Sequence, residues 1–330
     1  NAGTVYCINC TNITVRDLWL TGGGDGISLF NTTGSRVEKN TLTDRGRGIL
    51  LNRSREIAIF ANNASGNGYG IYLSSSSNNL LRENRIGGEN DYGIFLSESE
   101  NNRLEYNDMQ GNRRNFYAAG DNDVDGSNRV DGKPIAYLVG ASGEVIDPSS
   151  EAGVVYCYRC DNVTVRGLTL EKNVYGIYFH NSSRSRAEDN VVRDDVDGIR
   201  LEGSTDCIVV GNRFSDNDAR GIFLTESDGN LVARNAATGN GEGINLTGSE
   251  NNTLEANEVQ ENELAGIALA SSQRNFLSSN LALDNGLGMS LNYSGGNLLR
   301  DNRMSGNVRD FSAEGLNISD FENDIDPSNL

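Results

Sequence analysis

Residues 70–86, GIYLSSSSNNLLRENRI, contain the pattern that decides the fold. A Gly-Ile pair, a Leu two positions after the Ile, and regularly spaced Ser, Asn and apolar residues recur every 22 or 23 residues. A fixed period of this length indicates a repeat architecture, in which each repeat packs mainly on its neighbours. The Gly-Ile pairs begin at Gly26, Gly48, Gly70, Gly93, Gly176, Gly198, Gly221, Gly243 and Gly266, and Gly288-Met289 continues the series.

Each repeat holds three short segments in which apolar and polar residues alternate, separated by Gly, Asn and Ser. Alternation with a period of two is typical of strands, and no segment shows the i, i+3, i+4, i+7 stripe of a helix. The repeat also lacks the signature of leucine-rich repeats. The pattern predicts an all-β fold, a parallel β-helix of about 22-residue coils. We expect these residues to point inward: Ile71, Leu73, Leu81, Ile94, Leu96, Leu104, Ile199, Leu201, Ile222, Leu224, Leu254 and Leu269.

Asparagine is abundant, with 44 residues, and many recur at the same position of the repeat. Stacked amides can hydrogen-bond from one coil to the next, so we interpret these columns as structural ladders rather than sugar-binding groups. Asparagine also tolerates the left-handed backbone that tight corners need. The main column comprises Asn40, Asn62, Asn84, Asn107, Asn190, Asn212, Asn235, Asn257, Asn280 and Asn302, and a second includes Asn67, Asn112, Asn217, Asn240, Asn262, Asn285 and Asn307.

The sequence also contains a longer duplication, which spans several of the short repeats. The run VYCINCTNITVR at residues 5–16 reappears as VYCYRCDNVTVR at 155–166, an offset of 150 residues. We therefore predict a first β-helix block over residues 1–120, an irregular connector over 121–153 and a second block over 154–330, with 312–330 leaving the regular coil. Both ends of the sequence resemble the two sides of the connector, so we expect a segment of a longer array or a subunit that meets a copy of itself.

The repeat template, the CTNITV entry to a block and the VDGKPIAYL run at residues 130–138 resemble the NosD-like, carbohydrate-binding and sugar-hydrolysis (CASH) group of proteins. The resemblance covers nearly the whole chain and implies a right-handed parallel β-helix. Tandem versions are frequent in archaeal surface proteins, notably those of methanogens. The group includes nitrous-oxide-reductase maturation factors, epimerase- and lyase-like enzymes and envelope proteins, so the fold alone does not decide the function.

The composition restricts the classes of partner. Asp and Glu number 46 against 28 Lys and Arg, a formal net charge of −18, and 36% of the residues are hydrophobic. An acidic surface repels phosphate backbones, so nucleic-acid binding is not expected. No apolar run reaches the length of a membrane-spanning helix.

The cysteines form two CxxC pairs, Cys7/Cys10 and Cys157/Cys160, and Cys207 is the fifth. The two pairs lie about seven coils apart, roughly 30 Å at the spacing of stacked strands, too far for one zinc ion. We expect these cysteines to pack structurally, with or without a local Cys7–Cys10 disulfide. Copper ligation, which the NosD resemblance implies, is disfavoured because Met is scarce and the chain has a single histidine, His180.

Residues 121–126, DNDVDG, form the first half of a calcium-binding loop. Asp121, Asp123 and Asp125 are the candidate ligands, and calcium is the one cofactor that we consider. The bidentate Glu expected at the twelfth position is replaced by Gly132, so a solvated acidic turn is the alternative.

A cluster of carboxylates provides the candidate catalytic site for carbohydrate chemistry. It comprises Asp194, Asp195, Asp197, Asp216 and Asp218, with Arg193, Arg220 and His180 nearby. Hydrolases and lyases need such groups at defined separations. We nevertheless interpret the cluster as an acidic solvated edge rather than a catalytic site, and the Asp-Pro-His motif of alginate-type epimerases is absent.

Eleven N-x-Ser/Thr sequons suggest an exported, glycosylated surface protein. They are Asn9, Asn12, Asn31, Asn52, Asn63, Asn162, Asn181, Asn245, Asn251, Asn292 and Asn317. Our first functional expectation is an extracellular, structural envelope protein, an S-layer or sheath component that assembles with itself through the edges of its β-helix. The alternatives are a polysaccharide-binding or polysaccharide-modifying protein, with cell-surface glycans as partners, and NosD-like metal delivery.

Overall fold

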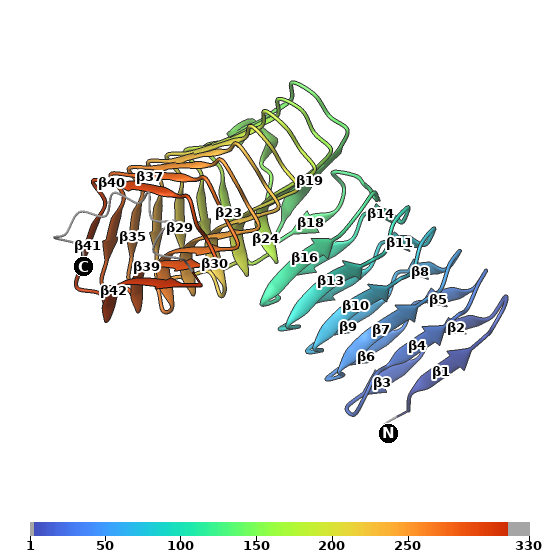
Figure 1. Cartoon of the computed structure of the whole chain (residues 1–330). Helices are drawn as coiled ribbons and strands as arrows, with labels where there is room; N and C mark the ends of the chain where they lie inside the picture. The colour runs from blue at the N-terminus through green and yellow to red at the C-terminus, as the bar shows by residue number, and fades with distance from the viewer. Residues whose placement is uncertain (1–2, 316–330) are drawn as a thin grey trace. The chain divides into compact units, whose positions relative to one another are not determined.

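The computed structural model describes residues 3–315, and the regular elements in this stretch are 42 β-strands and one short 3₁₀ helix, η1 (Pro148–Ser150). The described residues divide into two compact units, residues 3–137 with 172–174 and residues 138–171 with 175–315. Within each unit the strands stack in parallel into three sheets, as Figure 1 shows for β4, β7, β10 and β13. In the described part of the chain, no helix is long and apolar enough to cross a membrane.

One repeat makes one coil, with one strand in each sheet. Residues 69–87 form β10 (Tyr69–Ser74), β11 (Leu80–Arg82) and β12 (Arg85–Gly87). The next coil repeats the three strands in register, so that Leu73 pairs with Leu96 and Leu81 with Leu104. The prediction of a parallel β-helix with coils of 22 or 23 residues is confirmed.

The strands of unit 1 fall into three sheets. The first sheet, which carries the Gly-Ile pairs, contains β1 (Val5–Ile8), β4 (Ile27–Phe30), β7 (Arg47–Asn52), β10, β13 (Tyr92–Ser97) and β16 (Arg114–Ala118). The second contains β2 (Thr14–Arg16), β5 (Arg36–Glu38), β8 (Ala58–Phe60), β11, β14 (Arg103–Glu105) and β17 (Asp123–Val124). The third contains β3 (Trp19–Thr21), β6 (Thr41–Thr43), β9 (Asn63–Ser65), β12, β15 (Asp108–Gln110) and β18 (Arg129–Val130).

The strands of unit 2 repeat this arrangement. Its first sheet contains β21 (Val154–Tyr158), β24 (Tyr175–His180), β27 (Asp197–Glu202), β30 (Arg220–Thr225), β33 (Glu242–Thr247), β36 (Ala265–Ala270), β39 (Leu287–Asn292) and β42 (Arg309–Glu314). The second contains β20 (Val145–Ile146), β22 (Thr164–Arg166), β25 (Arg186–Glu188), β28 (Ile208–Val210), β31 (Leu231–Ala233), β34 (Thr253–Glu255), β37 (Phe276–Ser278) and β40 (Leu298–Arg300). The third contains β23 (Thr169–Glu171), β26 (Val191–Arg193), β29 (Arg213–Ser215), β32 (Ala236–Thr238), β35 (Glu258–Gln260), β38 (Leu281–Leu283) and β41 (Arg303–Ser305).

The core is a stack of identical apolar positions inside each coil. In the first sheet of unit 2, Ile222 pairs with Ile244 and Leu224 with Leu246, and all four side chains are fully buried. All twelve residues predicted to point inward are buried, which confirms the register taken from the sequence. Burying these side chains is the main favourable contribution to folding, since each contributes about 1.5–3 kcal/mol.

The glycine of each Gly-Ile pair is required by close approach between coils. A Cβ built on Gly48 would lie 2.6 Å from the carbonyl oxygen of Gly70 in the next coil. A methyl group cannot occupy that position without displacing the backbone of the neighbouring strand. This contact explains why glycine recurs with the coil period.

Each typical coil turns at four corners with a left-handed backbone. In the coil that begins at β7 these corners are Arg53, Glu56, Ala61 and Gly66, with φ of 48°, 56°, 52° and 63°. Corners occupied by residues other than Gly and Asn carry a conformational penalty.

The asparagine columns form buried ladders of hydrogen bonds. Asn84 donates its side-chain amide to Asn107 Oδ1 at 2.9 Å and to the Ile59 carbonyl at 2.9 Å. The same bonds recur from coil to coil in both units, because each amide both donates and accepts. The main column runs through Asn40, Asn62, Asn84, Asn107 and Asn128 in unit 1 and through Asn190, Asn212, Asn235, Asn257, Asn280 and Asn302 in unit 2.

Residues 121–153, expected to be an irregular connector, are regular at their start. β17 pairs with β14 and β18 pairs with β15, and both pairings are parallel, so residues 123–130 continue the coil without a Gly-Ile pair. The departure comes at β19 (Lys133–Val139), which pairs antiparallel with β18. At the other end of the chain, β42 pairs with β39 as far as Glu314, beyond the expected boundary at 312, and residues 316–330 lie outside the described part.

Candidate functional site

The outward side chains of β24, β27 and β30 form a polar and aromatic surface on unit 2, which we call the outer face. In these strands the Ile of each Gly-Ile pair and the Leu or Phe two residues later are buried in the core, so the residues that alternate with them lie on the other side of the sheet. The residue before each Gly-Ile pair lies beside them. The parallel register places them in three rows that run from coil to coil. The rows are Tyr175–Asp197–Arg220, Tyr178–Arg200–Phe223 and His180–Glu202–Thr225.

Arg200 is the centre of the outer face. Its guanidinium carbon lies 5.2 Å from the ring centre of Tyr175 and 4.9 Å from that of Phe223, so it is stacked between side chains of the two adjacent coils. Nη1 donates to the Tyr175 hydroxyl at 3.0 Å, and Nε donates to Glu202 Oε2 at 2.9 Å. Burial alone would lower the pKa of Arg200, but Tyr175, Glu202 and Asp197 outweigh it and raise the pKa above its usual value. The guanidinium is therefore charged and fixed in one orientation.

A directed chain of hydrogen bonds joins His180 to the same carboxylate. The Tyr178 hydroxyl donates to Glu202 Oε2 at 2.9 Å and lies 3.1 Å from His180 Nδ1. The amide of Asn181 lies 3.0 Å from His180 Nε2. The Tyr178 hydroxyl therefore connects the His180 ring to the Glu202 carboxylate.

Asp197 lies beneath the side chains of Arg200 and Arg220. It is 1% exposed, and its Oδ1 lies 3.1 Å from Arg220 Nε while its Oδ2 lies 3.9 Å from Arg200 Nη1. Burial raises the pKa of Asp197 to about 6, although both arginines oppose the shift. Asp197 balances the charges of the two arginines but is too deeply buried to contact a ligand itself.

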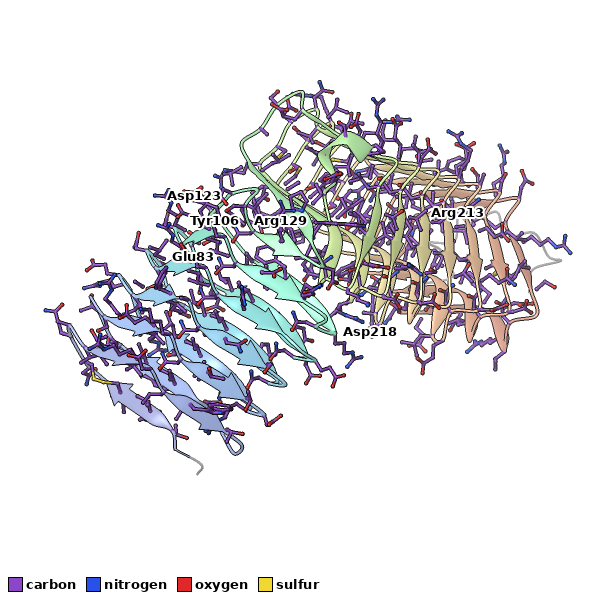
Figure 2. All side chains as sticks on the ribbon, turned by 180° about the vertical axis from the view of Figure 1, so that it is seen from behind. Glu83, Tyr106, Asp123, Arg129, Arg213 and Asp218 are labelled. Carbon is purple, nitrogen blue, oxygen red and sulfur yellow. A yellow bond between two sulfur atoms is a disulfide. The ribbon has the colours of Figure 1, made fainter. Side chains whose placement is uncertain are left out.

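The five carboxylates predicted as a catalytic cluster do not form one group. Asp194 and Asp216 occupy successive left-handed corners, with φ of 55° and 57°. Asp195 is fully buried and occupies an asparagine position of the second ladder, where its main-chain N–H donates to Asn217 Oδ1 at 3.0 Å. Asp218 lies at an exposed corner before β30, labelled in Figure 2. Of the five, Asp197 alone belongs to the rows of the outer face, and it is buried beneath the half-exposed side chains there.

The predicted calcium ligands are likewise dispersed. Asp125 Oδ1 accepts from the main-chain N–H of Ser127 at 3.0 Å, and Asp123, labelled in Figure 2, lies 3.7 Å from Arg103. Across residues 3–315, no three His, Cys, Asp or Glu side chains gather closely enough to hold a metal ion.

The cysteines differ between the two units. Cys7 and Cys10 form a disulfide, whereas Cys157, Cys160 and Cys207 are free and buried. The sequons are accessible, since the ten that the structure describes have exposed or half-buried asparagines, and Asn317 lies outside the described residues.

His180 and Arg220 were predicted to lie near the acidic cluster. The other members of the outer face, Tyr175, Tyr178, Arg200, Glu202 and Phe223, were not predicted as site residues. The signal was available: each of these residues lies one before the glycine of a Gly-Ile pair, one after its Ile or three after it. Reading the outward positions of successive repeats as rows would have found them.

The fold and its outer face define a parallel β-helix repeat protein. The sequence model of a family described as "Periplasmic copper-binding protein (NosD)" matches residues 1–130 and 128–324. The chain therefore belongs to the NosD family. No curated protein matches the chain.

Solved structures with the same kind of fold are distant. The Azotobacter vinelandii mannuronan C-5 epimerase AlgE6 A-module is 14% identical, with a TM-score of 0.39, 89% of this chain covered and 90% of that one. The periplasmic alginate epimerase AlgG is 15% identical, with a TM-score of 0.43 and coverages of 92% and 68%. PfbA, a surface adhesin of Streptococcus pneumoniae, is 13% identical, with a TM-score of 0.38 and coverages of 95% and 87%. At these values the likeness carries no argument about activity.

The residues present do not fit the copper ion that the family description implies. Copper in proteins is held by Cys, Met and His. Met109 and Met289 are fully buried in the core, and both ring nitrogens of His180 are hydrogen-bonded to neighbouring side chains. Cys157 and Cys160 are adjacent soft donors, and the described residues supply no group of three His, Cys, Asp or Glu around them.

Proposed function

We propose that the chain is an extracytoplasmic polysaccharide-binding protein of the cell envelope, and that the outer face of unit 2 is its binding surface. The observation that carries the proposal is Arg200, a half-buried guanidinium held between two aromatic rings and a carboxylate, with Glu202, His180 and Arg220 half-buried beside it. The periplasmic description of the NosD family supports the location.

The shape of the outer face suits a chain-like ligand. Its three rows continue into β33, where Glu242, Asn245 and Thr247 follow Arg220, Phe223 and Thr225. Successive coils are about 4.8 Å apart, so the row His180–Glu202–Thr225–Thr247 presents a polar group at each step along the stack. A polymer lying along the stack meets a regular series of donors and acceptors.

The chemistry of the outer face suits hydroxyl-rich ligands. Guanidinium, carboxylate, amide and imidazole groups each offer two or more hydrogen-bonding atoms, which matches neighbouring hydroxyls of a sugar. The side chains of Arg200, Arg220, His180 and Glu202 are 21%, 26%, 27% and 33% exposed, enough to contact a ligand. Because their mutual bonds already fix their rotamers, binding loses little conformational entropy.

The outer face supports binding better than catalysis. Its acid with a raised pKa, Asp197, is buried, and Glu202 is held by Arg200 and Tyr178. Incubation with uronate polymers, with and without calcium, tests this distinction. Release of unsaturated chain ends would indicate a lyase and overturn the preference for binding alone.

The test of binding is a screen of neutral and uronate-containing polysaccharides, followed by titration calorimetry with the best ligand. Arg220→Gln should weaken binding about tenfold or more, because a hydrogen bond to a charged group contributes roughly 1.5–3 kcal/mol. Arg213→Gln is the matched control, since Arg213 is an exposed arginine of β29 in the third sheet of the same unit (Figure 2). Failure to bind any polysaccharide, or equal weakening by both variants, would contradict the proposal.

A structural role in the envelope is a second proposal, which the hydrogen-bonded stacking of the coils supports. In the described residues β1 pairs with β4 on one side only. Open strand edges are templates for pairing with a further coil or a second copy. Sedimentation at high concentration tests this role, and a single species of 35.6 kDa would argue against it.

A further inference from the structure

We propose that Cys157 and Cys160 form a second disulfide, equivalent to the Cys7–Cys10 disulfide of unit 1. The structure holds the two residues as adjacent free thiols in a corner that already has the geometry of the bridged one. The disulfide would close the first corner of unit 2 in the same way as its counterpart closes the first corner of unit 1.

The two corners are equivalent in sequence and in hydrogen bonding. Cys7 pairs with Leu29 and Cys157 with Phe179, an offset of 150 residues on both strands. The main-chain N–H of Asn9 donates to the Phe30 carbonyl at 3.0 Å, and that of Arg159 donates to the His180 carbonyl at 2.8 Å.

The backbone turns are also the same. Asn9 and Arg159, which lie between the two cysteines of each pair, have φ of 56° and 52°. Asn12 and Asn162, two residues after the second cysteine, both have φ of 55°. A disulfide needs specific Cα and Cβ placement, and the Cys7–Cys10 corner meets that requirement with this backbone. The Cys157–Cys160 corner therefore accepts a disulfide without rearrangement of the chain.

The pKa values of the two thiols favour formation of the disulfide. The Cys157 thiol donates a hydrogen bond to the Cys160 sulfur, which lowers the pKa of Cys160 and, together with burial, raises that of Cys157. Cys160 is therefore the attacking thiolate. Burial raises the pKa of Cys207 to about 11, so the third free thiol is the least reactive.

The oxidant is a disulfide such as oxidised glutathione, which oxidising compartments supply. The Cys160 thiolate attacks one sulfur of the oxidant, forms a mixed disulfide and releases one glutathione thiolate. Cys157 then loses its proton to solvent, and its sulfur attacks the Cys160 sulfur and releases the second thiolate. Because both cysteines are at most 1% exposed in the finished coil, the oxidant reaches them once the corner has formed and before the neighbouring coils cover it.

The experiment counts free thiols in the whole chain. The protein is refolded in a glutathione redox buffer and alkylated in denaturant, and its intact mass gives the number of labels. The wild type should carry one label, on Cys207, and Cys207→Ser should carry none. Peptide mapping should recover Cys157 linked to Cys160.

Three labels on the wild type together with two on Cys207→Ser would show that Cys157 and Cys160 stay reduced, and would overturn the proposal. A peptide linking Cys207 to either residue would overturn the assigned pairing. Cys157→Ser is the complementary variant, because it should carry two labels, on Cys160 and Cys207, with the Cys7–Cys10 disulfide intact.

Discussion

Tyr178 donates its hydroxyl proton to Glu202 on the next coil, at 2.9 Å. The phenol is buried, whereas the carboxylate is half-exposed, so the bond couples the layer beneath the outer face to its surface. Outward residues of adjacent coils thus act together, although 24 residues of sequence separate them.

The first prediction concerns the energy of this bond. Tyr178→Phe should lower the free energy of unfolding by about 1–3 kcal/mol, since a hydrogen bond to a charged group is lost. A double-mutant cycle with Glu202→Gln, measured by urea unfolding, should give a coupling energy of about 1 kcal/mol. Tyr72→Phe is the control: among the bonds described for residues 3–315 its hydroxyl makes none, so the change should stay within about 0.5 kcal/mol.

The second prediction concerns the pH dependence of stability. The pKa of Asp197 is raised to about 6 in the folded protein, from 3.8 in an ordinary environment. Between these values the folded chain holds a proton that the unfolded chain has lost, so this residue lowers stability as pH rises from about 4 to about 6. The decrease should total roughly 3 kcal/mol.

Unfolding of Asp197→Asn at pH of about 4 and about 6.5 tests this linkage. The variant should lack this part of the pH dependence, whereas Asp218→Asn, at an exposed corner of the same unit, should retain it. If wild type and Asp197→Asn lose stability equally over this interval, the raised pKa is wrong.

The sequence allows the core to be predicted because alternation leaves few choices. In strand β30, for example, alternation places Ile222 and Leu224 on the same side of the sheet, and both side chains are buried. The outer face was harder to predict. The contacts of Arg200 depend on rotamers and on side chains contributed by two other coils, which no spacing within one repeat reveals.

Two differences from expectation have clear physical reasons. Asp194 and Asp195 are neighbours in sequence, but Asp194 occupies a left-handed corner and Asp195 occupies the buried ladder. Their carboxyl groups therefore do not form the predicted catalytic cluster. Residues 121–130 lack the Gly-Ile pair, yet Asn107 donates to Asn128 Oδ1 at 2.8 Å. The ladder therefore keeps this coil in register without the usual template.

The third prediction concerns a left-handed corner. Ala256 has φ of 52°, a conformation that an L-residue with a Cβ adopts at a penalty of about 1–2 kcal/mol. Ala256→Gly should therefore raise the urea midpoint, by a net gain of up to about 1 kcal/mol after the larger backbone entropy of unfolded glycine is subtracted. The same change at Ala58, within strand β8, should lower stability by about 0.5–1 kcal/mol. Equal effects at both positions would contradict the assigned corner.

The fourth prediction concerns close packing between coils. Gly48→Ala places a methyl group 2.6 Å from the Gly70 carbonyl oxygen, and the backbone of the next coil must move to accept it. The expected loss is about 1–3 kcal/mol. Gly24→Ala is the matched control, because a Cβ at Gly24 meets no atom within 4 Å and its φ is not in the left-handed region. Thermal unfolding of the two variants should separate them clearly, and similar midpoints would exclude this role for the Gly-Ile glycine.

The last prediction concerns Asp195 in the amide ladder. Elsewhere in the second ladder each asparagine donates its amide to the next, as Asn217 does to Asn240 Oδ1 at 2.8 Å. A carboxylate at this fully buried position has no N–H to donate to Asn217. Asp195→Asn should therefore stabilise the protein by about 1–3 kcal/mol at neutral pH.

The reciprocal substitution provides the control. Asn212 in the main ladder donates to Asn235 Oδ1 at 3.0 Å and to the Ala187 carbonyl at 2.9 Å, so Asn212→Asp replaces both donors with negative charge and should lower the free energy of unfolding by at least about 3 kcal/mol. Urea unfolding at neutral pH measures both changes. A destabilising Asp195→Asn would mean that the carboxylate is selected at this position, and the ladder interpretation of Asp195 would have to be abandoned.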